Sequence, residues 1–227
     1  MFNLRADYLA TAQAYERVLK TRNAVLRQVG DGALDRRRAE DLLSVYDQQV
    51  AEIGARVIGA RVAFLEIVRG ELATAFASIT RTGLQASARY VVRSAAVTVE
   101  EILAKLAASR TKDFATNATQ VGPHRDDVIF ELEGRDAGTS ASQGQLRAIM
   151  LAWKTAELQV LGRAHGDPPI LLLDDVSSEL DPQRNAFLFE HLATLAGQCF
   201  ITTTHPGHVL LRQHRADYRI AKGEISE

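Results

Sequence analysis

The sequence has few features that would impose covalent or membrane constraints. Its 227 residues include a single cysteine, Cys199, which excludes an internal disulfide framework and fits a reducing compartment. No apolar run is long enough to span a bilayer, and the first residues lack the pattern of a signal peptide. The formal net charge of -1 gives no general basic field, so any nucleic-acid contact has to be a local patch. We therefore expect a cytoplasmic protein without a membrane partner.

The first third of the chain also lacks proline, and its apolar residues recur every three or four positions. One such stripe runs through residues 9–26, a second through residues 34–58, and a Gly-Asp-Gly break at residues 30–32 separates them. This pattern predicts two antiparallel helices with a third following. Three glycines could interrupt or bend the second stripe: Gly54, Gly59 and Gly70. We assign residues 1–82 to a helical arm domain.

The pattern changes near Gly83. Residues 90–92 and 128–132 are typical of β-strands, and residues 99–106 between them predict a helix. After residue 123 the expected order is strand, loop, helix, strand, helix, strand. That order favours an α/β fold with a parallel sheet and crossover helices. We assign residues 83–227 to this second domain.

The sequence ILLLDD, which ends at Asp174 and Asp175, is the most informative segment. Four apolar residues predict a strand buried on both faces, with two carboxylates at its carboxyl end, where open α/β sheets bind ligands. Paired carboxylates at a rigid edge suit a hydrated Mg²⁺ on a nucleotide phosphate. The segment therefore reads as a Walker B motif. The alternative is that both acids only cap the following turn.

A second candidate segment, SQGQ, begins at Ser142 and precedes a long amphipathic helix. Ser142 suits an N-cap position, and Gly144 would let a phosphate approach the unpaired amides at the positive end of the helix dipole. Taken alone, a serine cap is the simpler interpretation. The position about thirty residues before ILLLDD favours a phosphate site.

Four motifs in order carry a family resemblance. They are VGPHRDD at residues 121–127, SQGQLR at 142–147, PILLLDDVSSELD at 169–181 and FITTT at 200–204. This series resembles the RecF family of bacterial DNA replication and repair proteins, which is related to the SMC and ABC-type ATPases. The arm segment YERVLKTRN at residues 15–23 resembles that family's Y-x-x-x-L-K-x-R-N segment. The resemblance covers nearly the whole chain and implies an ABC-type ATPase lobe with a helical arm.

One element of such ATPases is missing. The chain contains no GxxxxGK(S/T) phosphate-binding loop, because no lysine follows a glycine in that setting. We therefore expect the carboxyl-terminal part of a RecF-like protein, without the Walker A segment. The chain resembles an ATPase but lacks this loop, so we expect no ATPase activity from the isolated chain. Whether it forms part of an enzyme stays open at this point.

The resemblance implies roles for particular residues. Asp174 would bind Mg²⁺ through water, and Asp175 would orient the attacking water. Thr204 or His205 would sense the γ-phosphate, with the register uncertain by one residue. Asp181 would cap the helix that follows it, and its loop, residues 178–181, would cross the dimer interface. The signature residues would contact ATP held by a second protomer: Ser142, Gln143, Gly144 and Gln145.

The resemblance also implies partners. A RecF-like protein would bind ATP with Mg²⁺, dimerise on gapped or single-stranded DNA, and help mediator proteins load the recombinase during the SOS response. The alternative is a non-catalytic fragment that binds DNA or protein. A transporter ATPase subunit would not explain the arm. For Arg125, bracing by Asp126 or Asp127 and a weaker DNA-contact role both remain open.

Overall fold

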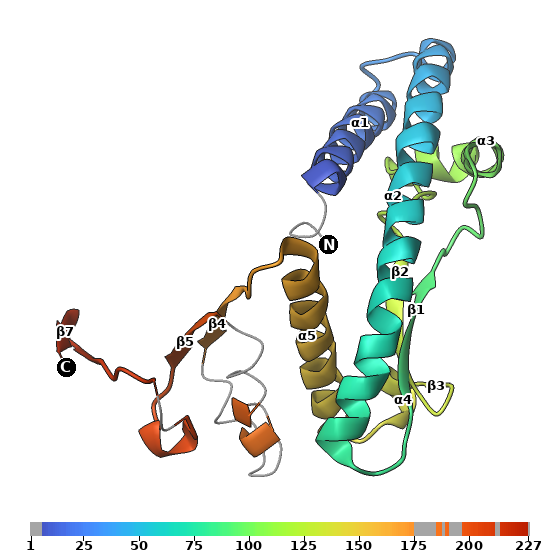
Figure 1. Ribbon diagram of the computed structural model, residues 1–227. Coiled ribbons are helices and arrows are strands. Elements are labelled where there is room, and N and C mark those ends of the chain that lie inside the picture. Colours follow the sequence, from blue (N-terminus) through green and yellow to red (C-terminus); the bar gives the residue numbers. More distant parts are fainter. Residues whose placement is uncertain (1–5, 175–184, 188, 191–196, 212–213, 227) are drawn as a thin grey trace.

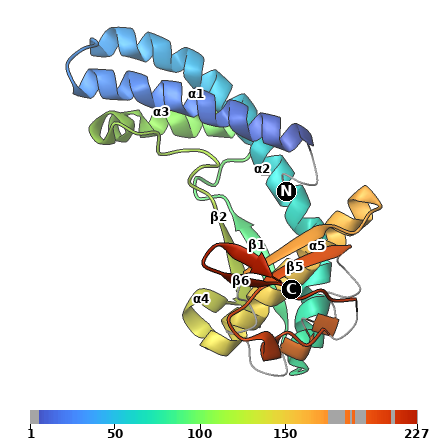
Figure 2. The same cartoon turned by 90° about the vertical axis from the view of Figure 1, so that its left-hand side faces the viewer.

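The computed structural model describes residues 6–174, 185–187, 189–190, 197–211 and 214–226. Helices α1, α2 and α3 form an elongated projection (Figures 1 and 2). Strands β1 and β2 and helices α4 and α5 lie along the far half of α2, and strands β4 to β7 extend to the side beyond α5 (Figure 1). The helices are α1 (Ala6–Gly30), α2 (Arg36–Thr80), α3 (Val99–Thr116), α4 (Ala137–Ser140), α5 (Gln143–His165) and the 3₁₀ turn η2 (Pro206–His208). The strands are β1 (Ala86–Val91), β2 (Asp127–Leu132), β3 (Arg135–Asp136), β4 (Ile170–Asp174), β5 (Gln198–Thr202), β6 (Arg219–Ala221) and β7 (Glu224–Ser226).

Helices α1 and α2 form the predicted antiparallel pair (Figure 1). Helix α1 ends at Gly30, as the Gly-Asp-Gly break predicts. Helix α2 starts where Asp35 caps it, since the Asp35 carboxylate accepts from the Arg37 and Arg38 amides. A further helix, α3, lies against the same end of α2, and its Thr98–Glu101 capping box fixes its start.

Helix α2 is longer than its sequence pattern predicts. Of the possible effects of Gly54, Gly59 and Gly70, interruption does not occur, because one continuous helix runs from Arg36 to Thr80. A glycine within a helix costs about 1 kcal/mol relative to alanine. Packing along both halves of α2 offsets that cost, since one half packs on α1 and α3 and the other on α5 and β1.

The described residues form three packing clusters, of which a small one lies between α1 and the start of α2 and contains Val25, Leu26, Ala39 and Leu43. The arm cluster joins α1, α2 and α3 around residues such as Tyr15, Ile58 and Leu106. The lobe cluster joins the later part of α2 to α5 and the strands around residues such as Phe76 and Ile149. Helix α2 therefore contributes to both the arm cluster and the lobe cluster, and the division at residues 82 and 83 stays a prediction.

The strands form separate small sheets. Strands β1 and β2 pair antiparallel, with β3 beside β2, and β6 and β7 form an antiparallel hairpin. Strands β4 and β5 pair in parallel, so that Asp174 lies opposite Thr202. The chain therefore has the expected α/β character with a parallel pair and packed helices, but the strand at residues 128–132 pairs antiparallel rather than in the parallel sheet.

Strand β4 differs from its prediction in burial. Leu171 and Leu173 pack against the lobe cluster, whereas Ile170 and Leu172 on the opposite face are 66% and 74% exposed. The expectation of burial on both faces is therefore wrong for this structure. Alternation of side chains along the strand gives each face its own environment. Phe200 of β5, 54% exposed, continues the exposed apolar face.

Candidate nucleotide-site residues

The carboxyl ends of β4 and β5 bring two polar side chains together. The Thr202 hydroxyl donates a hydrogen bond to the Asp174 carboxylate, and both residues are exposed. The parallel register places them side by side. A carboxylate beside a hydroxyl at a strand end is an arrangement of hard oxygen atoms that suits a hydrated Mg²⁺. Among the described residues, however, no group of three or more His, Cys, Asp or Glu side chains could hold a metal by themselves.

Sequence reasoning missed Thr202. The resemblance implied Thr204 or His205 as the γ-phosphate sensor, and both residues follow β5, which ends at Thr202. The Thr204 hydroxyl instead lies 2.9 Å from Nδ1 of His205, and the His205 ring stacks on His208 at 5.2 Å. The register of β5 against β4 would have identified Thr202, but a single sequence does not show that register.

The SQGQ segment begins α5 as expected. Ser142 is the N-cap, its hydroxyl accepts from the Gln145 amide at 3.2 Å, and the Gln145 side chain accepts from the Ser142 amide at 2.8 Å. This capping box satisfies two amides that a helix start otherwise leaves unpaired. Gln143 and Ser142 are exposed, and Gly144 is half-buried. Because these residues are at least partly exposed, an anion can reach the amino end of α5.

The structure does not join all the candidate residues. Ser142 follows α4 beside the β1–β2–β3 sheet, whereas Asp174 ends a strand of the separate β4–β5 sheet. No hydrogen bond or ion pair links Ser142 to Asp174 in the part of the chain that the structure describes. Asp175 and Asp181 lie outside the described residues.

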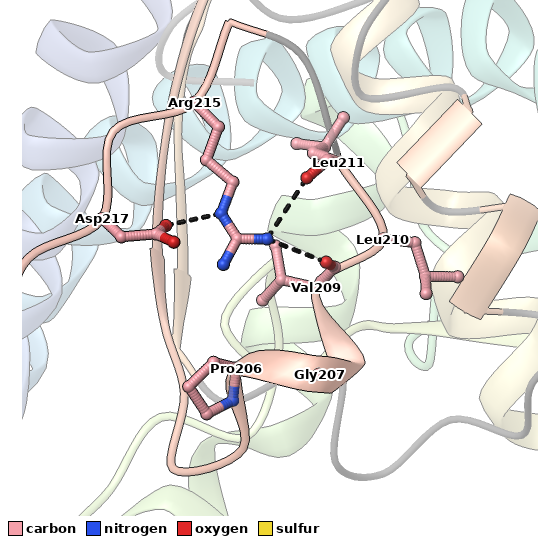
Figure 3. Close-up of a pocket in the computed structure, with 7 residues that line it drawn as sticks. All are labelled: Pro206, Gly207, Val209, Leu210, Leu211, Arg215 and Asp217. Atoms are coloured by element: carbon pink, nitrogen blue, oxygen red, sulfur yellow. Dashed lines mark hydrogen bonds and ion pairs between the residues drawn. The ribbon is translucent and has the colours of Figure 1, made fainter.

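A shallow cavity of about 540 Å³ follows the carboxyl end of β5 (Figure 3). The Arg215 side chain lies in it and donates to the carbonyls of Val209 and Leu211 and to the Asp217 carboxylate. The Arg215 guanidinium is therefore already bound to acceptors of the protein itself. The lining residues are Pro206, Gly207, Val209, Leu210, Leu211, Arg215 and Asp217.

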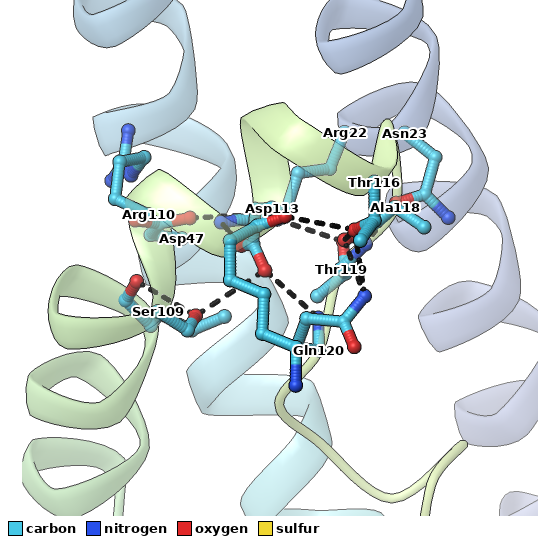
Figure 4. A network of polar contacts seen from close by, with 12 residues as sticks. Arg22, Asn23, Asp47, Ser109, Arg110, Asp113, Thr116, Ala118, Thr119 and Gln120 are labelled. Carbon is cyan, nitrogen blue, oxygen red and sulfur yellow. Dashed lines mark hydrogen bonds and ion pairs between the residues drawn. The ribbon is translucent and has the colours of Figure 1, made fainter.

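A buried polar network lies in the arm, and sequence reasoning missed it (Figure 4). Arg22 is fully buried and pairs with the carboxylates of Asp47 at 2.7 Å and Asp113 at 2.8 Å. Arg110 also pairs with Asp47. Two arginines and two aspartates from α1, α2 and α3 thus balance each other's charge, as buried ions require.

The same network holds the loop of the VGPHRDD motif. The Thr119 hydroxyl accepts from Arg22 at 2.7 Å and donates to the Asn23 side chain at 2.6 Å. Nε2 of His124 lies 3.0 Å from the Thr119 carbonyl, and Nδ1 lies 2.8 Å from the Tyr15 hydroxyl. Since a carbonyl only accepts, Nε2 carries the proton and Nδ1 accepts. Part of His124 is exposed, but partial burial of its ring lowers the pKa of His124. The lower pKa favours this neutral form.

Arg125 does not form the predicted contact with its neighbouring aspartates. Its guanidinium lies 3.4 Å from the Thr119 carbonyl, while Asp126 accepts from Tyr90 and the Arg93 amide. Asp127 pairs with the Arg93 side chain at 3.0 Å. The turn at residues 121–125 directs these side chains apart, so Arg125 helps to hold the loop through a backbone carbonyl.

Comparisons with known proteins agree with these features. No protein-family model matches the chain. It is 37% identical over 237 residues to the DNA replication and repair protein RecF of Geobacter sulfurreducens, covering 100% of this chain and 62% of that protein. It is 40% identical over 213 residues to RecF of Myxococcus xanthus, covering 90% and 54%. Sequence and motif order match the carboxyl-terminal portion of RecF.

The fold agrees as well. A solved structure described as the recombination mediator protein RecF-ATP in the RecFOR pathway has a TM-score of 0.80 and 28% identity, covering 98% of this chain and 59% of that one. A second RecF structure of that pathway, described as RecF-ATPrS, gives a TM-score of 0.82 at the same identity and coverage. The chain spans about three fifths of the length of these RecF proteins. Its described residues include no helix long and apolar enough to cross a membrane.

Proposed function

We propose that this chain supplies the acidic strand end and the signature loop of a RecF-type ATPase that acts in recombinational DNA repair. The observation that carries the proposal is the position of Asp174 beside Thr202 at the carboxyl edge of a parallel strand pair. The similarity to RecF structures described with ATP supports it. The missing phosphate-binding loop would come from the segment of RecF that this chain does not match.

In this proposal the site residues act in a composite nucleotide site. Asp174 would hold Mg²⁺ through water, and Mg²⁺ bound there would offset charge on the phosphates. Asp175 would orient the attacking water, and Thr204 or His205 would respond to the γ-phosphate. Asp181 would lie in the loop that crosses the interface between protomers. A nucleotide held by a second protomer would contact the signature residues Ser142, Gln143, Gly144 and Gln145.

The exposed apolar face of β4 and β5 supports a composite site. Ile170, Leu172 and Phe200 expose apolar surface at the strands that carry Asp174 and Thr202. Soluble proteins rarely leave such a contiguous face open without a partner. We infer that the Walker A segment packs on this face, which would place phosphate-binding amides near Asp174.

The proposed biological role rests on the similarity to RecF. A RecF-like protein would bind gapped or single-stranded DNA in the cytoplasm, work with recombination mediator proteins, and support the SOS response. Residues 1–82 would form the arm domain and residues 83–227 the ATPase-like domain in that assembly. The neutral overall charge requires the DNA contact to be local.

The first test is reconstitution of ATP hydrolysis. We expect no turnover by the chain alone, and measurable turnover when it is mixed with the amino-terminal segment of the Geobacter sulfurreducens relative. Ser142→Asp should reduce turnover of the mixture at least tenfold, because a carboxylate there repels the phosphate. Aspartate caps helices as well as serine does, so the thermal stability of this variant should match that of the parent.

Two results would count against the proposal. Turnover by the chain alone would show that the phosphate-binding loop is not needed from elsewhere. Full ATPase activity of the mixture that contains Ser142→Asp would show that Ser142 does not contact the nucleotide phosphate. Asp174→Asn serves as a further variant, since it keeps the acceptor for the Thr202 hydroxyl but removes the charge that Mg²⁺ requires.

A second candidate function is a non-catalytic DNA-binding fragment, which the absence of GxxxxGK(S/T) favours. We then expect the chain without nucleotide to bind gapped DNA in gel-shift titrations. Affinity should fall when salt is raised from 50 to 200 mM, roughly as phosphate contacts predict, by about tenfold or more. No shift at low salt would leave this fragment without a DNA-binding function of its own.

A further inference from the structure

The arm cluster and the lobe cluster meet at one place on α2. Residues 50–58 of α2 belong to the arm cluster and residues 65–79 to the lobe cluster. Tyr90 of β1 packs against both. The short stretch of α2 between the two clusters carries Arg61. A change in the angle between arm and lobe therefore requires α2 to bend near this residue.

Arg61 joins three other segments there. Its Nε donates to the Tyr8 hydroxyl of α1 at 3.0 Å, and its Nη1 donates to the Tyr90 hydroxyl of β1 at 3.1 Å. Nη1 also donates to the carbonyl of Pro123 in the VGPHRDD loop at 2.6 Å. One guanidinium therefore ties α1, β1 and that loop to α2.

Tyr90 extends this set of bonds to the start of β2. Its hydroxyl donates to Asp126 at 2.7 Å while accepting from Arg61, and the second oxygen of Asp126 accepts from the Arg93 amide at 3.1 Å. Burial raises the pKa of Tyr90 well above its ordinary value, so the hydroxyl keeps the proton that it donates. Arg61, Tyr90 and Asp126 are each only half-buried, so water can replace these bonds at small cost.

An exposed glycine of α2 lies close to this point. Gly59 precedes Arg61 by two positions, is exposed, and has no atom within 4 Å of the place where a Cβ would lie. Nothing in its surroundings requires glycine. Because glycine stabilises a helix about 1 kcal/mol less than alanine does, Gly59 lowers the cost of bending α2 at this point. Gly70 is equally open, but it lies between Val68 and Leu72, which are both buried in the lobe cluster, so a bend there would not change the angle between arm and lobe.

We propose that Arg61, Tyr90 and Asp126 form a polar joint that fixes the direction of the arm relative to the lobe, with Gly59 as the bending point when the joint opens. The joint would set how far the arm lies from the lobe that carries Ser142. A partner bound to the arm could favour the open or closed joint by binding one angle better. The inference rests on the contacts at the joint and does not depend on ATP hydrolysis.

The test measures the distance between arm and lobe by pulsed electron paramagnetic resonance. Spin labels are attached at Arg38→Cys near the arm tip and Met150→Cys on α5, both exposed positions, in a Cys199→Ala background. The parent should give one narrow distance distribution. Arg61→Met and Tyr90→Phe should each broaden it at least twofold, since both remove bonds of the joint.

Adding Gly59→Ala to Tyr90→Phe should narrow the distribution again, because alanine stiffens the bending point. Arg56→Met is the matched control: it removes an exposed arginine from the same helix and should leave the width unchanged. Tyr90→Phe keeps the ring in both clusters and decides the outcome if Arg61→Met fails to fold. An unchanged width in Tyr90→Phe overturns the joint, and persistent broadening with Gly59→Ala overturns the bending point.

Discussion

Replacing Arg22 with methionine is expected to destabilise the chain by about 3–5 kcal/mol, because it leaves buried carboxylates without their partner. Arg22 is fully buried and lies 2.7 Å from Asp47 and 2.8 Å from Asp113. Asp47 would keep its contact with Arg110, so most of the loss should come from Asp113. The loss is measured as the free energy of unfolding in urea, followed by circular dichroism of the helices.

Two variants separate this effect from a general loss of charge. Arg17→Met removes an exposed arginine from the same helix and should change the free energy of unfolding by less than about 0.5 kcal/mol. Asp113→Asn added to Arg22→Met should recover part of the loss, since the side-chain oxygen of asparagine still accepts from the Gln120 amide. A loss below about 1 kcal/mol for Arg22→Met would contradict the role of this network in stability.

Replacing Gly122 with alanine is expected to cost about 2–4 kcal/mol, because strain and a steric clash add at one residue. Gly122 has a backbone φ of 129°, which residues with a side chain rarely adopt. A Cβ at this position would lie 2.3 Å from the Tyr15 hydroxyl oxygen. The clash would push Tyr15 away from His124 and release the VGPHRDD loop from α1. Hydrogen exchange of amides in α1 and in residues 119–126 should therefore accelerate together.

Gly83→Ala isolates the backbone contribution. Gly83 also has a positive φ, of 74°, but no atom lies within 4 Å of its missing Cβ. Its substitution should cost about 1–2 kcal/mol. Equal losses at Gly83 and Gly122 would show that the approach of Tyr15 contributes nothing, whereas a larger loss at Gly122 gives the clash together with the added strain of its φ of 129°.

The elements that sequence predicted best depend on neighbours within one helical turn. The Ser142 cap and its bond to Gln145 follow from residues three positions apart, and the end of α1 at Gly30 follows from a local glycine pair. The motif order likewise identified the RecF resemblance before any fold was known. Such features are local in the chain, so the sequence pattern alone contains them.

The elements that sequence missed depend on packing between distant segments. Arg22 and Thr119 are 97 positions apart, and no local pattern distinguishes Arg22 from an exposed arginine of α1. The contact between Thr202 and Asp174 needs the register of two parallel strands. The continuity of α2 through Gly54 and Gly59 needs the partners on both of its halves.

The sequence by itself determined the resemblance to RecF, the helices of the arm and the capped start of α5, because motif order, periodicity and capping are written in adjacent residues. Only the tertiary structure decided which charges are buried, which hydroxyl faces Asp174 and where the arm meets the lobe. The physical reason is that burial and long-range hydrogen bonds are properties of the packed chain, and the same side chain is solvated in one packing and indispensable in another.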